Sequence, residues 1–165
     1  MRLNRLTLTL GLLAAGAAAS AGTVQVDFVA PTNYSDAGRT LAEAQANRDT
    51  LARYLQALGD RYLAPGEALK VDVLDIDLAG TVRPSRRTQG DLRITRGSAD
   101  YPRIKMRYSL VSGDKVVRSG EETVSDLNYL GHTPNYSNEY PLRFEKRMLA
   151  DWFKARFVEH KAAAG

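Results

Sequence analysis

The stretch PRIKMRYSLV, from Pro102 to Val111, decides the fold because apolar and basic side chains alternate along it. Four apolar side chains at every second position share one face of an extended chain: Ile104, Met106, Tyr108 and Leu110. The positions between them carry three cations: Arg103, Lys105 and Arg107. This alternation is typical of a strand with one buried and one solvated face. The stretch therefore predicts a sheet that is covered on one side.

The segments around this strand predict the rest of the sheet. Residues 112–115 (SGDK) have the composition of a tight turn into a second strand over residues 116–124, which together make a hairpin. Further strands are predicted over residues 24–29, 69–78 and 92–95. In the second of these the apolar positions change parity, which predicts a β-bulge near Leu74. Residues 79–90 have the composition of a loop.

Two amphipathic helices complete the predicted fold. Thr40 and Glu43 form a capping box at the start of the first helix, which ends near Ala64. The second helix is predicted over residues 142–158, with Pro141 near its first turn. The order is then β-α-β-β-β-β-α. We predict one α+β two-layer sandwich, an antiparallel-rich sheet of about five strands with both helices on one face. The first β-α-β unit suits a right-handed parallel crossover.

The N-terminus has the pattern of a signal peptide. Arg2 and Arg5 precede an apolar run at residues 6–15, and Ala19 and Ala21 supply small residues for cleavage. The run is too short to span a bilayer comfortably, so we expect no membrane span in the mature chain. We expect a signal peptide at residues 1–21 and one domain at residues 22–165, which ends in a short disordered Ala-rich tail. The expected location is periplasmic or secreted.

Charge and cysteine content narrow the function classes. Loss of residues 1–21 would remove Arg2 and Arg5 from the 23 basic residues, which leaves 21 against 19 acidic residues and a net charge of +2. This excess is too small to imply nucleic-acid or membrane binding by itself, and no nucleic-acid partner is expected. The chain contains no cysteine. Disulfides, thiolate nucleophiles and zinc–thiolate sites are therefore excluded.

One loop contains the residues best suited to chemistry. NYLGHTPNYSNEYP, residues 128–141, holds Asn128, Tyr129 and His132, and Glu145 follows in the predicted helix. A small hydrolase or a metal-dependent enzyme centred on His132 would use such groups. Their spacing matches no catalytic or metal-binding motif, and the alternative is a loop histidine bonded to backbone or water. Glu145, near the apolar stripe, would then need a structural partner such as an arginine. We assign no catalytic, metal or cofactor residues and expect no cofactor.

A second candidate is a basic surface for an anionic partner. Its members lie on two predicted strands and a flanking loop: Arg83, Arg86, Arg87, Arg93, Arg103, Lys105 and Arg107, with Arg96 beside them. Such a patch suits an anionic envelope component or an acidic face of another periplasmic protein. The alternative is an ordinary solvated sheet face on which acidic side chains neutralise the cations. Three aspartates, Asp72, Asp75 and Asp77, are interpreted as the charges of an edge strand rather than as a calcium or acid–base site.

Five stretches resemble a known family. They are YSDAG (34–38), VLDIDLAG (73–80), YPRIKMRY (101–108), SDLNYL (125–130) and LRFEKRMLADWF (142–153). They are similar to the secreted proteobacterial family called domain of unknown function three thousand and sixteen, over nearly all of the mature chain. The resemblance implies an exported envelope protein of Gram-negative bacteria and brings no catalytic or ligand-binding residues. We therefore favour a non-enzymatic binding or envelope-support domain of open oligomeric state, with the His132 enzyme as the alternative.

Overall fold

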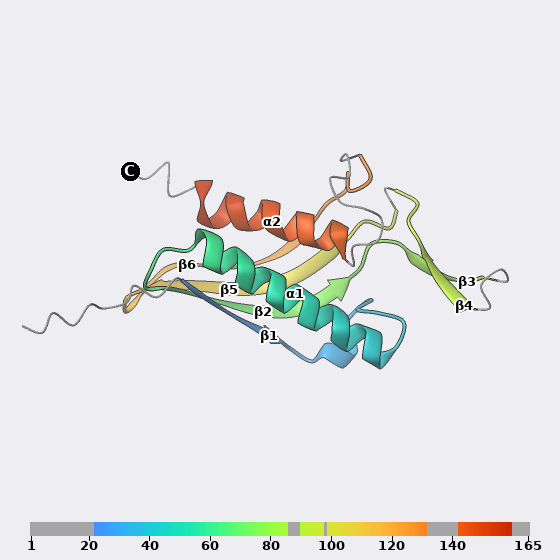
Figure 1. Cartoon of the computed structure of the whole chain (residues 1–165), viewed down its shortest axis with the longest axis horizontal. Coiled ribbons are helices and arrows are strands. Elements are labelled where there is room, and N and C mark those ends of the chain that lie inside the picture. Colours follow the sequence, from blue (N-terminus) through green and yellow to red (C-terminus); the bar gives the residue numbers. More distant parts are fainter. Residues whose placement is uncertain (1–21, 86–89, 98, 132–141, 160–165) are drawn as a thin grey trace, which may run out of the picture.

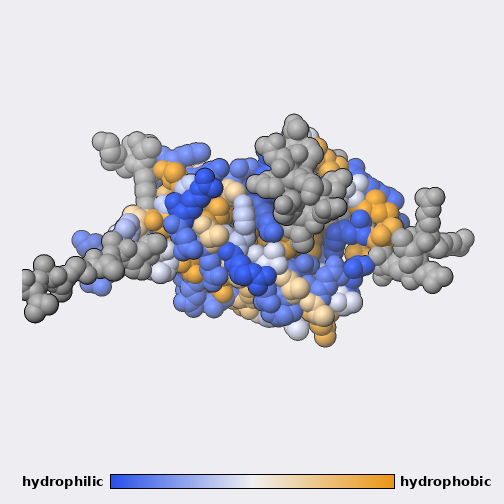
Figure 2. All heavy atoms as spheres, viewed as in Figure 1, coloured by the Kyte–Doolittle hydropathy of each residue, from blue (hydrophilic) through white to orange (hydrophobic). Residues whose placement is uncertain are grey.

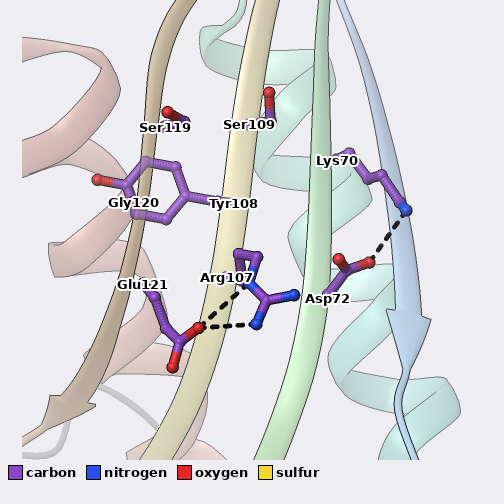
Figure 3. Close-up of a pocket in the computed structure, with 8 residues that line it drawn as sticks. All are labelled: Lys70, Asp72, Arg107, Tyr108, Ser109, Ser119, Gly120 and Glu121. Carbon is purple, nitrogen blue, oxygen red and sulfur yellow. Dashed lines mark hydrogen bonds and ion pairs between the residues drawn. The ribbon is translucent and has the colours of Figure 1, made fainter.

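The computed structural model describes residues 22–85, 90–97, 99–131 and 142–159, and it is an α+β two-layer sandwich, as predicted. Its elements in chain order are β1 (Thr23–Phe28), the 3-10 helix η1 (Pro31–Asn33), α1 (Leu41–Tyr62), β2 (Glu67–Asp77), β3 (Thr81–Ser85), β4 (Gly90–Ile94), β5 (Arg103–Ser112), β6 (Lys115–Ser125) and α2 (Arg143–Phe157). Four strands form one sheet in the order β1-β2-β5-β6. Both helices cover the same face of this sheet, and the opposite face is open (Figures 1 and 3).

The strands divide differently from the prediction in one respect. Residues 81–85, expected within a loop, form β3 and pair with β4 as a separate two-stranded hairpin. β3 was not predicted as a strand because it contains Arg83 and Pro84 and shows no clean apolar alternation. We call this hairpin, Thr81–Ile94, the arm; it projects beyond one end of the four-stranded sheet (Figure 1).

The first β-α-β unit is a parallel crossover, as expected. β1 pairs in parallel with β2, and α1 packs back on β1. Gly59 in α1 allows this close approach, because a Cβ at that position would collide with the Val24 side chain. At the start of α1, the Thr40 hydroxyl accepts a hydrogen bond from the Glu43 N–H at 3.1 Å. The Glu43 carboxylate instead accepts the Arg39 N–H at 3.1 Å, so only half of the predicted capping box is formed.

The predicted bulge in β2 is confirmed. The register between β2 and β5 shifts between Val73 and Asp75. Val73 and Ile76 are buried on both sides of this shift, so the bulge keeps the apolar residues of both halves in the core. β2 lies between β1 and β5, however, so its aspartates are not on an edge strand. Asp72 and Asp77 instead lie opposite Arg107 and Arg103 of β5.

The core lies between the sheet and the two helices, and the aromatic side chains of α2 fill much of it. Phe153 and Phe157 are at most 1% exposed. The Tyr108 ring meets Trp152 and Phe157 edge-on, with ring centroids 5.6 Å apart in each case. The fully buried core residues lie between Ala37 and Phe157, and Val24, Val26 and Phe28 of β1 pack against them partly buried. The described strands and helices run from Thr23 to Phe157, so a chain that starts at Gly22 contains all of them.

The predictions for the two ends of the chain fall outside the described residues. These are the signal peptide at residues 1–21 and the Ala-rich tail at residues 161–165. Among the helices that the structure does describe, none is both long and apolar enough to cross a membrane.

Candidate functional site

The cations of β5 lie on the open face of the sheet, and each is paired with an acidic side chain. Arg103 binds Asp77 of β2. Lys105 Nζ lies 3.1 Å from Glu121 Oε1, and Arg107 Nη2 lies 2.9 Å from Glu121 Oε2. The hydrogen bonds from Arg107 and then Lys105 lower the pKa of the Glu121 carboxyl. Each of these three members of the predicted basic patch thus contacts a carboxylate, although Lys105 and Arg107 share that of Glu121.

A shallow hollow of ≈ 330 Å³ lies on this open face (Figure 3). It is lined by Lys70, Asp72, Arg107, Tyr108, Ser109, Ser119, Gly120 and Glu121. Lys70 Nζ lies 3.2 Å from Asp72 Oδ1, and Arg107 donates two hydrogen bonds to Glu121 Oε2. Because both cations are already paired, an anionic ligand in the hollow would compete for them with Asp72 and Glu121.

A second hollow of ≈ 450 Å³ runs between β6 and α2. Glu122 lies in its wall and accepts hydrogen bonds from Trp152 Nε1 at 2.9 Å and from Arg156 Nη2 at 2.8 Å. The bond from Arg156 outweighs partial burial and lowers the pKa of Glu122. The carboxylate therefore serves to hold α2 on the sheet edge, and it provides no free ligand group.

The arm is fixed to the body by Arg93. Its guanidinium donates to both carboxylate oxygens of Asp36, at 2.8 Å and 2.9 Å, and to the carbonyl oxygen of Gly80 at 3.1 Å. Burial opposes the charge of Arg93, but the hydrogen bond and the charge of Asp36 prevail and raise its pKa. Gly80 has a φ of +88°, and a Cβ there would lie 2.9 Å from the Ile94 carbonyl oxygen. The arm leaves the body at a point that favours glycine.

The other described arginines of this region are exposed and lack a described acidic partner. Arg83 lies on β3, and Arg96 lies two residues beyond β4. No ion pair joins either side chain to an acidic side chain among the described residues. In the sequence, residues 81–96 contain five arginines and one acidic residue, a net charge of +4 that equals the net charge of the entire chain. Two of these five, Arg86 and Arg87, lie outside the described residues.

Only some of the candidate loop residues lie at the start of α2. Tyr129 is buried, its hydroxyl donates to Asp100 Oδ1 at 2.6 Å, and its ring meets Phe144 of α2 edge-on at 4.7 Å. Burial and the bond to Asp100 raise the pKa of Tyr129. Asn128 is exposed in a turn, where its N–H donates to Asp126 Oδ1. His132 lies outside the described residues, so the enzyme hypothesis that centres on it stays a prediction.

Glu145 is the most deeply buried charged side chain described, at 3% exposure. Its Oε1 accepts a hydrogen bond from the Ala79 N–H at 2.8 Å, which joins α2 to the chain just before the arm. Burial raises its pKa, although this backbone hydrogen bond and the charge of Arg93 act in the opposite direction. The expected arginine partner is thus replaced by a backbone N–H. Within the described residues, no group of three His, Asp or Glu side chains is placed to hold a metal ion.

The family model described as "Protein of unknown function (DUF3016)" matches residues 22–155. This segment is well over half of the chain. The chain belongs to this family. No curated protein and no solved structure matches it.

In this DUF3016 protein, four of the stretches that carry the resemblance meet at the base of the arm. Asp36 binds Arg93, Ala79 binds Glu145, and Tyr129 packs on the residue before Glu145. Sequence reasoning did not assign Asp36, because it binds a residue 57 positions away and no local spacing indicates the pair. These contacts hold the arm to the body. The exposed Arg83 and Arg96 are not used in them and are open to a partner.

Proposed function

We propose that this chain is exported and acts, without catalysing a reaction, as a binding protein for an anionic component of the cell envelope. The arm is the contact surface, and the partner bears phosphate or other closely spaced anionic groups. The pattern of residues 1–21 supports export, and the missing cysteines suit an envelope protein that is stable without disulfides.

The observation that carries the proposed partner is the contrast between two sets of cations. On the open sheet face, Lys105 and Arg107 share the partner Glu121. On the arm side, Arg83 and Arg96 have no described acidic partner, and the local sequence is strongly basic. A free guanidinium presents a planar set of donors that matches phosphate oxygens, and binding there breaks no existing ion pair.

Export is tested by the N-terminus of the protein recovered from a Gram-negative host. We expect cleavage after Ala21, so that intact-mass measurement gives a chain that begins at Gly22. Ala21→Arg is expected to prevent cleavage, because the peptidase requires a small residue at this position. Wild-type protein that keeps residues 1–21 and stays in the cytosolic fraction would contradict export.

Anion binding is tested with long-chain polyphosphate as a soluble probe and the chain from Gly22 onward. Arg83→Gln with Arg96→Gln removes two unpaired charges, and we expect roughly tenfold weaker binding at low ionic strength. Lys105→Gln with Arg107→Gln makes the same change in net charge but removes cations that share the Glu121 carboxylate, so it is the matched control and is expected to bind within about twofold of wild type. Calorimetric titration measures both.

Two results of this titration would contradict the proposal. If the arm variant binds as wild type does, the arm is not the contact surface and the proposal fails. A loss confined to the Lys105 and Arg107 variant would also contradict it, and would place the contact on the open sheet face that the sequence included in its patch.

A further inference from the structure

One face of the arm combines cationic and apolar side chains. In the β3–β4 register, Arg83 lies opposite Leu92 and Thr81 lies opposite Ile94. Residues directly opposite each other in an antiparallel pair project from the same face. Leu92 and Ile94, two positions apart on β4, are 43% and 39% exposed, so both aliphatic side chains are open to solvent. We call these four residues the outer face of the arm.

The outer face points away from the contact that fixes the arm. Val82 and Arg93 are opposite each other in register and alternate with the outer-face residues, so they project from the other face. Arg93 uses that face to bind Asp36 of the body. In the space-filling view, hydrophobic and strongly hydrophilic residues lie next to each other at the end of the molecule where the arm projects (Figure 2). The outer face is therefore presented to the surroundings on a projecting element.

We propose that the outer face of the arm docks on an anionic lipid surface, with Leu92 and Ile94 entering the boundary of the acyl layer. This inference rests on the proposed function and names the source of its anionic groups. A soluble polyanion would satisfy the arginines but leave both aliphatic side chains in water. A lipid surface provides phosphates for Arg83 of the outer face and for the exposed Arg96 just beyond β4, with an apolar layer directly beneath the phosphates.

The size of the arm favours this occupant over a folded protein. Stable protein interfaces bury about 800 Å² per partner, and the outer face offers two aliphatic side chains on a two-stranded hairpin. Long arginine side chains can extend their guanidinium groups toward headgroups while neighbouring aliphatic side chains lie deeper in the lipid. The arm projects beyond the end of the four-stranded sheet, so the sheet leaves it free to approach a surface (Figure 1).

The test compares vesicles that contain anionic phospholipid with long-chain polyphosphate, again with the chain from Gly22 onward. Leu92→Ser with Ile94→Ser is expected to lower vesicle binding roughly tenfold and to leave polyphosphate binding unchanged. Arg83→Gln with Arg96→Gln is expected to weaken both. If the serine variant binds vesicles as wild type does, lipid docking is overturned while anion binding stands. If the glutamine variant changes neither, the proposed function itself fails.

A second variant keeps the test independent of any effect on folding. Leu92→Trp preserves an apolar side chain, and the native Trp152 is buried and gives a constant background. We expect its fluorescence to shift to the blue with anionic vesicles, and to show no shift with neutral vesicles or with polyphosphate. Brominated acyl chains should then quench it. An unshifted spectrum with anionic vesicles would overturn the proposal.

Discussion

Glu145→Ala is expected to lower the free energy of unfolding by about 3 kcal/mol, whereas Glu145→Gln is expected to unfold no more easily than wild type at neutral pH. Alanine removes the acceptor of the Ala79 N–H and leaves a cavity at a buried position. Glutamine keeps an oxygen where Glu145 Oε1 lies and replaces the other carboxylate oxygen by a neutral NH2 group. Denaturant unfolding of the three proteins measures the difference.

The stability of wild type and of Glu145→Gln should also depend differently on pH. Burial raises the pKa of Glu145 in the folded protein, so the folded state binds this proton more tightly than the unfolded chain does. Its contribution to stability is fully present below the unfolded pKa and is lost as the pH rises through the folded pKa. As the pH rises through this range, wild type should lose this contribution and Glu145→Gln should not. The free energy of unfolding of Glu145→Gln should therefore increase relative to that of wild type.

Asp151→Asn is the matched control for Glu145→Gln. Asp151 lies on the same helix but is exposed, with only a 3.8 Å ion pair to Arg147, and its amide variant is expected to change stability by less than about 0.5 kcal/mol. If Glu145→Gln loses as much stability as Glu145→Ala, the ionised carboxylate itself stabilises the fold. The interaction with the charge of Arg93 would then outweigh the cost of burial.

The sequence predicted those features that depend on local periodicity. The alternation in residues 102–111 indicated one covered face, and the parity change in residues 69–78 located the bulge of β2. Each is a consequence of side chains pointing to opposite faces of a strand at every step. The two helices and the turn at residues 112–115 were predicted on the same local grounds.

Charge neutralisation on the sheet depends on strand register, which the sequence did not determine. A hairpin that starts from Ser112 opposite Lys115 would place Gly120 opposite Arg107. An irregularity between Leu110 and Val111 shifts the pairing by one, and Glu121 lies opposite Arg107 instead. A one-residue shift moves every side chain to the other face, so the partners of Lys105 and Arg107 could not be found from spacing alone.

Arg93→Ala is expected to increase amide hydrogen exchange in the arm about 30-fold while exchange in β2 and β5 stays unchanged. A two-stranded hairpin is marginally stable by itself, so its attachment to the body determines how often it opens. The paired hydrogen bonds between Arg93 and Asp36 are only partly exposed and contribute about 2 kcal/mol, which corresponds to this change in the open population. Peptide-resolved exchange measurements on residues 81–84 and 92–96 would show it.

A double-mutant cycle separates this contact from the loss of packing by the arginine side chain. Asp36→Ala removes the acceptor, and the effects of Asp36→Ala and Arg93→Ala should combine to much less than their sum, because both remove the same pair. Arg103→Ala breaks an ion pair on the open sheet face and should leave exchange in the arm at the wild-type rate. Fully additive effects of the first two substitutions would mean that the contact does not hold the arm. Coupling would instead make Asp36 the residue that fixes the position of the arm relative to the body.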